Sequence, residues 1–116
     1  MRFLIAFDGS SGAVACAEFL KKLMKEDDIV EGLFVLNDTT VPMKFNFFDG
    51  IRTVENIEDL LKSLDDLFNA IFENHKNKSF KYLIQERANI ADEIVRYAII
   101  SNADIIVTGT SKLKGI

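Results

Sequence analysis

Two short stretches of the sequence, DGSSG at residues 8–12 and GTSK at residues 109–112, each follow an apolar run. Glycines allow backbone amides to approach a ligand closely, and hydroxyl groups and a lysine ammonium suit phosphate oxygens. The carboxylate of Asp8 can accept hydrogen bonds from a ribose or bind phosphates through Mg²⁺. The two stretches therefore predict an anion site, although a plain strand-to-helix turn explains the first of them equally well.

Hydrophobic patterning predicts the elements that must position these residues. Apolar runs without polar alternation are typical of parallel strands that are covered on both faces. Apolar residues at helical spacing predict helices between them, with Asn89 as the cap of the last helix. The expected order is a three-layer α/β/α sandwich with a mostly parallel sheet and right-handed crossovers. We expect strands at residues 3–7, 29–36, 80–86 and 104–107, and helices at 11–26, 53–74 and 89–102.

Ligands of open α/β sheets bind beyond the carboxyl ends of the strands, where the strand order reverses. If strands 3–7 and 104–107 are neighbours, the DGSSG and GTSK stretches face each other across one crevice. The amino end of the first helix adds a partial positive charge there. The segment GTSKLKG does not have the spacing of a Walker phosphate loop.

Length and composition limit the function classes. A chain of 116 residues is expected to form one domain, spanning residues 1–116. Its net charge of −4 gives no electrostatic footprint for nucleic acid or for an anionic membrane. The N-terminal apolar run is too short for a signal peptide or a membrane span. A single cysteine, Cys16, cannot form an internal disulfide, which favours a cytoplasmic location.

Three other features could do chemistry. His75 is expected to be a solvated side chain or one that complements the dipole at a helix end, and Cys16 a buried, inert thiol. Residues 39–52 form a less regular segment with Pro42 and an Asp49-Gly50 turn signal. Its aromatic part, residues 43–48, either caps the core, closes over the crevice or contacts another subunit. No Ser-His-Asp set and no Cys/His metal spacing is assignable, so we expect no enzyme, or at most slow incidental ATP hydrolysis.

Two longer segments, FLIAFDGSSGAVACAEFL and ANIADEIVRYAIISNADIIVTGTSKLKGI, resemble the opening and closing motifs of the universal stress protein family. The resemblance covers essentially the whole chain. It implies homodimers, five parallel strands in full-length members, and ATP binding in one branch of the family. Relative to such members, residues 1–116 lack the last helix and strand.

The resemblance also implies roles for individual residues. In the ATP-binding branch, the counterpart of Asp8 lies near the ribose and the metal, and a backbone group near Val35 contacts the adenine. A loop of the form G-x-x-G, with G-S/T nine residues later, surrounds the phosphates. Here Gly109 matches the first glycine, Lys112 replaces the second, and the sequence ends at Ile116 before the final pair. The implied site for ATP with Mg²⁺, the metal being held by Asp8, is Ala6, Phe7, Asp8, Gly9, Ser10, Val35, Gly109, Thr110, Ser111 and Lys112.

The leading hypothesis is a universal stress protein-like, ATP-binding regulatory protein of the stress response. The alternative is an interaction module of the same fold that binds no nucleotide, which Lys112 and the incomplete loop favour. A related adenylating enzyme would carry S-G-G-x-D-S after the first strand, and a receiver domain would carry paired acids there. This sequence has D-G-S-S-G with the one acid Asp8, which disfavours both. The apolar edge of the fourth strand suggests either that a second copy covers it or that the sequence is a shortened form of a longer protein.

Overall fold

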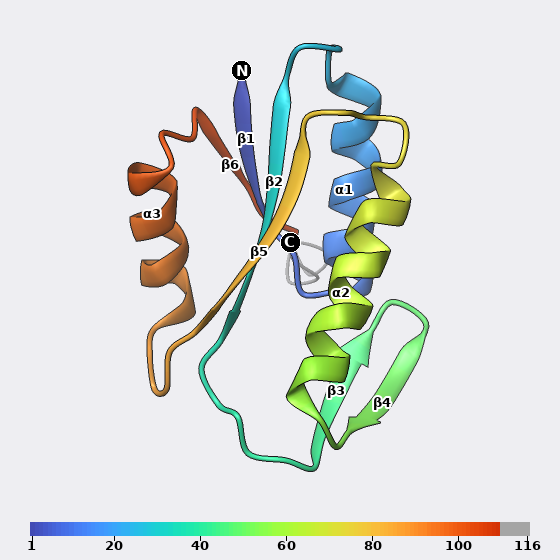
Figure 1. Cartoon of the computed structure of the whole chain (residues 1–116), viewed down its shortest axis with the longest axis vertical. Coiled ribbons are helices and arrows are strands. Elements are labelled where there is room, and N and C mark those ends of the chain that lie inside the picture. The colour runs from blue at the N-terminus through green and yellow to red at the C-terminus, as the bar shows by residue number, and fades with distance from the viewer. Residues whose placement is uncertain (110–116) are drawn as a thin grey trace, which may run out of the picture.

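The computed structural model describes residues 1–109, and a four-stranded parallel sheet lies at its centre (Figure 1). The strands follow the spatial order β5-β2-β1-β6. In the register of this sheet, Leu4 lies between Glu31 and Ile106. Strands β1 and β6 are neighbours, which is the condition on which the facing of the DGSSG and GTSK stretches depended. The strands are β1 (Arg2–Ala6), β2 (Ile29–Leu36), β5 (Lys78–Ile84) and β6 (Ile105–Val107).

Helices cover both faces of the sheet, which confirms the predicted three-layer α/β/α architecture (Figure 1). Helices α1 (Ser11–Leu23) and α2 (Ile57–Ile71) lie on one face, and α3 (Ile90–Ile100) lies on the other. Ser10 caps α1 and Asn89 caps α3, each accepting a hydrogen bond from a backbone N–H of the first turn. None of the described helices is long and apolar enough to cross a membrane.

The larger core lies between the sheet and the helix pair α1–α2. The rings of Phe7 and Phe68 meet edge to face, with their centroids 5.6 Å apart. Gly32 of β2 allows this packing, because a Cβ there would lie 2.6 Å from the Phe68 ring. A smaller apolar cluster under α3 includes Leu33 and Ala98.

The segment expected to be irregular is instead a β-hairpin, formed by β3 (Met43–Phe47) and β4 (Gly50–Val54). Met43, Phe45 and Phe47 alternate along β3 and pack into an apolar cluster with α2 and β2. The alternation along β3 and the Asp49-Gly50 turn specify a hairpin, and its second strand extends into residues 53 and 54, which the apolar spacing had assigned to the following helix.

The hairpin also shifts the boundaries of helix α2. Residues 53 and 54, predicted to start that helix, pair within the hairpin, and the helix begins at Ile57 after the cap residue Asn56. Asn56 accepts hydrogen bonds from the N–H groups of Glu58 and Asp59. His75 is not simply solvated, because its Nε2 lies 2.7 Å from the backbone oxygen of Asp28.

A buried acid, Glu31, lies on the face of the sheet that α3 covers. Its carboxylate accepts a hydrogen bond from the Ser79 hydroxyl at 3.1 Å. Tyr97 of α3 packs beside it, and burial together with hydrogen bonding to Glu31 raises the pKa of Tyr97 to about 12. The folded protein therefore favours the neutral phenol of Tyr97 beside this buried acid.

We predict a corresponding loss of stability at high pH. Because the folded-state pKa lies above the ordinary value of 10.0, the contribution of Tyr97 is complete below pH 10 and disappears between pH 10 and about 12. Absorbance titration of tyrosinate should show a step near pH 12 that is missing in Tyr97→Phe. A native protein in which both tyrosines titrate together near pH 10 would contradict this.

Candidate functional site

The DGSSG stretch forms the turn between β1 and α1. Asp8 Oδ1 accepts a hydrogen bond from the backbone N–H of Ser10 at 3.0 Å, which holds the turn in shape. Ser10 Oγ accepts one from the N–H of Ala13 at 3.3 Å and so begins the helix. The turn leaves the carboxylate of Asp8 exposed at the carboxyl end of the sheet.

Gly9 makes the close packing behind this turn possible. It has a φ of +75°, and a Cβ at this position would lie 2.7 Å from Leu64 Cδ2 and 3.2 Å from Phe47 Cδ1. Its carbonyl accepts a hydrogen bond from the N–H of Phe48 at 2.7 Å. The turn is thereby attached to both the hairpin and α2.

The start of the second stretch lies directly against the first. A Cβ on Gly109 would come within 2.3 Å of the carbonyl oxygen of Gly12, so the two glycines touch backbone to backbone. One turn of α1 further on, the thiol of Cys16 donates to the carbonyl of Thr108 at 3.4 Å. Cys16 was expected to be buried, but it is half-buried beside the site, with its side chain packed against the core.

Two adjoining cavities open at this end of the sheet. The smaller has a volume of about 300 Å³ and is largely apolar, with Val35, Ile90 and Ile94 among its walls. The larger has a volume of about 700 Å³ and lies between the DGSSG turn and the hairpin. Asp8, Phe45 and Gly109 line both cavities, so the carboxylate lies where the apolar and the polar spaces meet.

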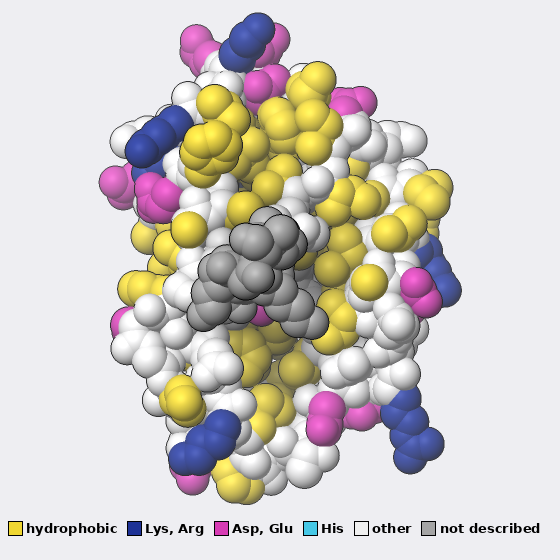
Figure 2. Space-filling view, turned by 180° about the vertical axis from the view of Figure 1, so that it is seen from behind, with side chains coloured by type: hydrophobic (Ala, Val, Ile, Leu, Met, Phe, Trp, Pro, Cys, Tyr) yellow, Lys and Arg dark blue, Asp and Glu magenta, His cyan; other side chains and the backbone are white. Residues whose placement is uncertain are grey.

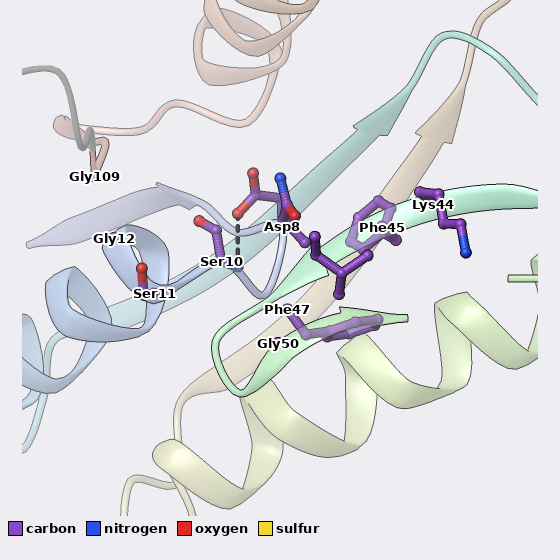
Figure 3. Close-up of a pocket in the computed structure, with 11 residues that line it drawn as sticks. Asp8, Ser10, Ser11, Gly12, Lys44, Phe45, Phe47, Gly50 and Gly109 are labelled. Carbon is purple, nitrogen blue, oxygen red and sulfur yellow. Dashed lines mark hydrogen bonds between the residues drawn. The ribbon is translucent and has the colours of Figure 1, made fainter. Parts of the chain in front are cut away.

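The hairpin supplies one wall of the larger cavity. For its aromatic part, residues 43–48, the sequence left open a cap on the core, a cover over the crevice and a subunit contact, and Phe45 and Phe47 both pack on the core and line the cavity. In the close-up of Figure 3, Phe45 lies beside Asp8, with Phe47 and Gly50 beneath them. Lys44 also lines this cavity, but its Nζ donates to Thr53 Oγ1 at 2.9 Å. The alternation of aromatic and polar residues ahead of Asp49-Gly50 is the signal that could have identified this wall.

The implied nucleotide-site residues fall into three groups. Ala6, Phe7, Asp8, Val35 and Gly109 line the smaller cavity, while Asp8, Gly109 and Ser10 line the larger one. Gly9 does not line either cavity as described and lies behind the turn, against Leu64 and Phe47. The remaining implied residues, Thr110, Ser111 and Lys112, lie outside the described residues.

The donor set limits the chemistry of the described site. Asp8 is the only carboxylate that lines either cavity within residues 1–109. In the same range, no group of three or more His, Cys, Asp or Glu side chains is arranged to hold a metal ion. A divalent cation at Asp8 would therefore need further oxygen ligands from a bound molecule, as the phosphates of a nucleotide provide.

We predict that Gly9→Ala lowers the free energy of unfolding by about 1–3 kcal/mol, the cost of holding alanine in a left-handed conformation, with a further cost from displacing Leu64. Denaturant unfolding measures this. Ser11→Ala, at an exposed position two residues away, is the control and should change the value by less than about 0.5 kcal/mol. Equal effects of the two substitutions would disprove the packing role of Gly9.

Comparison with known proteins places this geometry in context. The sequence model of the Universal stress protein family matches residues 1–116. No curated protein matches the chain. Among solved structures, protein Rv1636 of Mycobacterium tuberculosis H37Rv is similar, with a TM-score of 0.61, 16% identity, and coverage of 93% of this chain and 69% of that one. A universal stress protein in complex with cAMP has a TM-score of 0.60, 12% identity, and coverage of 92% and 74%.

Proposed function

The chain belongs to the universal stress protein family, and we propose that it is a cytoplasmic, homodimeric regulatory protein of the stress response that binds an adenine nucleotide, ATP with Mg²⁺. The observation that carries this proposal is the pair of adjoining cavities that meet at Asp8. A nucleotide has the same division, since an apolar base is joined through a ribose to charged phosphates.

The smaller cavity suits the base. Ala6, Val35 and Ile94 give it apolar walls, and the aromatic ring of Phe45 lies where it passes into the larger cavity. The backbone at the carboxyl end of β2 borders this cavity and supplies N–H and C=O groups. These groups can recognise a purine without a dedicated polar side chain.

The larger cavity suits the ribose and phosphates. The carboxylate of Asp8 is placed to accept hydrogen bonds from ribose hydroxyls, and Ser11 and Gly12 bring the first turn of α1 to the cavity wall. Backbone N–H groups at a helix amino end bind anions. Mg²⁺, when bound with the nucleotide, neutralises phosphate charge that Asp8 would otherwise repel.

Two further findings support nucleotide binding by a protein that is not an enzyme. One of the similar structures is a universal stress protein in complex with cAMP. In this chain, the single carboxylate of the described site is already needed for the ribose or the metal. It therefore leaves no second carboxylate in the described cavities to activate water for rapid hydrolysis, and the Lys44 ammonium at the cavity wall donates to Thr53.

The proposal is tested by calorimetric titration with Mg-ATP. We expect micromolar binding by the wild type and a loss of about ten- to a hundredfold in Asp8→Asn, because hydrogen bonds to a charged group contribute about 1.5–3 kcal/mol. Asparagine retains an oxygen that can accept the Ser10 N–H, so the turn is preserved. Asp27→Asn, an exposed acid in the turn that precedes β2, is the matched control and should bind normally.

A wild type that shows no heat and no thermal stabilisation with millimolar ATP would refute nucleotide binding. The alternative, an interaction module of the same fold, would then stand. Lys112 at the position of the second loop glycine is the sequence feature that favours this alternative.

Mg²⁺ dependence gives a second prediction. Chelation of Mg²⁺ should weaken ATP binding at least about tenfold, because the Asp8 carboxylate then faces unscreened phosphates. The singly charged cAMP should lose much less affinity, and Asp8→Asn should reduce the dependence for ATP. The same dependence in Asp8→Asn as in the wild type would show that the metal is not held at Asp8.

A further inference from the structure

Phe45 lies at the junction of the two cavities. It is the one residue of strands β3 and β4 that lines both of them, whereas Lys44 and Phe47 line the larger cavity only. In Figure 3 its ring lies beside the carboxylate of Asp8. Figure 2 shows the hollow at this end of the molecule from behind, with hydrophobic side chains on its floor between the hairpin and α3. The ring of Phe45 therefore borders the passage between the apolar and the polar space.

Two buried rings fix the position of Phe45. Its centroid lies 5.8 Å from that of Phe34 on β2, edge to face, and 5.1 Å from that of Phe47 on β3. Phe45 itself is half-buried, so part of its ring packs on the core and the rest is open to the cavities. A ring that is held in this way offers a flat apolar surface that a ligand does not have to order on binding.

Phe45 is also the aromatic ring of the smaller cavity that has free surface. Phe7 and Phe34 line the same cavity, but they are only 1% and 4% exposed, so almost none of their surface is available to a ligand. The other apolar walls are aliphatic and include Val35 and Ile94. A flat base that enters this cavity can therefore stack on the ring of Phe45.

Few polar side chains are available there to recognise the edge of a base. Among the described residues, Asp8 and Asn37 are the polar side chains that line the smaller cavity. The amide of Asn37 is held in place, because its Nδ2 donates to the carbonyl of Ala88 at 2.9 Å. Asp8 lies at the junction, where the proposed function places the ribose. Contact with the face of the base is therefore the means by which a side chain of this cavity can select it.

We propose that Phe45 stacks on the base of the bound nucleotide and makes the site prefer purine over pyrimidine nucleotides. Every base can stack on an aromatic side chain, but a purine has two fused rings and so offers a larger face than a pyrimidine. Where side-chain hydrogen bonds do not recognise the base, differences in stacking strength set the preference. The inference rests on the proposed nucleotide binding and adds to it the residue that selects the class of base.

Calorimetric titration with Mg-ATP, Mg-GTP and Mg-UTP tests the preference. We expect the wild type to bind ATP about five- to tenfold more tightly than UTP, and Phe45→Leu to reduce this ratio to about twofold. Leucine still fills the apolar cluster beside Phe34 but offers no flat ring. The ratio of ATP to GTP affinity should not change, because both bases are purines. A substitution that only loosened the site would weaken the binding of all three nucleotides equally.

Phe48→Leu is the matched control for this titration. Phe48 follows β3 directly, is 46% exposed and lines neither cavity. Its contact with the DGSSG turn is made by its backbone N–H, which the substitution keeps. This variant should therefore retain the wild-type ratio of ATP to UTP affinity.

Tryptophan fluorescence tests the contact directly. The chain has no tryptophan, so Phe45→Trp places a single indole at the junction and Phe48→Trp places one outside it. Mg-ATP should quench most of the emission of Phe45→Trp by stacking and little of that of Phe48→Trp. Inorganic triphosphate, which has no base, should quench neither. Because tryptophan keeps an aromatic ring against Phe34 and Phe47, this variant tests the contact even where Phe45→Leu unfolds.

An unchanged ratio of ATP to UTP affinity in folded Phe45→Leu, or equal quenching of the two tryptophan variants, would overturn this inference and leave nucleotide binding intact. A wild type that binds none of the three nucleotides would overturn the proposed function, and this inference with it. The titration of the wild type therefore distinguishes the two failures.

Discussion

At Gly9 the chain turns with a positive φ, because Leu64 and Phe47 pack against the place that a Cβ would occupy. Three parts of the fold meet at this residue: the end of β1, the middle of α2 and the hairpin. The hydrogen bond from Phe48 to the Gly9 carbonyl attaches the hairpin to the same turn. The position of Asp8 relative to the hairpin, and so the shape of the candidate site, depends on this contact.

A second close approach, between Gly109 and Gly12, fixes the position of the end of β6 relative to the start of α1 on the other side of the site. Parallel pairing of β1 and β6 brings the ends of the two strands together, and the missing side chains let their backbones touch. A carboxylate, a helix amino end and an apolar cavity therefore lie within one crevice. This arrangement favours binding of a ligand that is apolar at one end and anionic at the other.

Helices α1 and α3 each carry large apolar side chains that lie outside the core. Helix α1 buries Ala17 and Leu20 against the sheet but keeps Phe19 and Leu23 outside the core. Helix α3 likewise buries Ala98 and exposes Ile99. Each helix thus has one face toward the core and further apolar side chains outside it.

The sequence by itself determined the sandwich, the parallel sheet and the turn at Asp8. These depend on local information: continuous apolar runs, helical periodicity, and the caps Ser10 and Asn89. It also implied, by family resemblance, that Asp8, Val35 and Gly109 belong to one site. The role of the aromatic segment 43–48 stayed open in the sequence, because Phe45 and Phe47 are placed by long-range packing against Phe34 and Leu64.

Only the tertiary structure decided which apolar residues are core and which form a surface. Ile99 and Ile100 are identical in type and adjacent in sequence, and both are exposed. They differ in their neighbours, because Ile100 lines a groove with the end of β5 and Ile99 does not. That difference follows from strand order and helix orientation, and these are set by contacts between residues far apart in the chain.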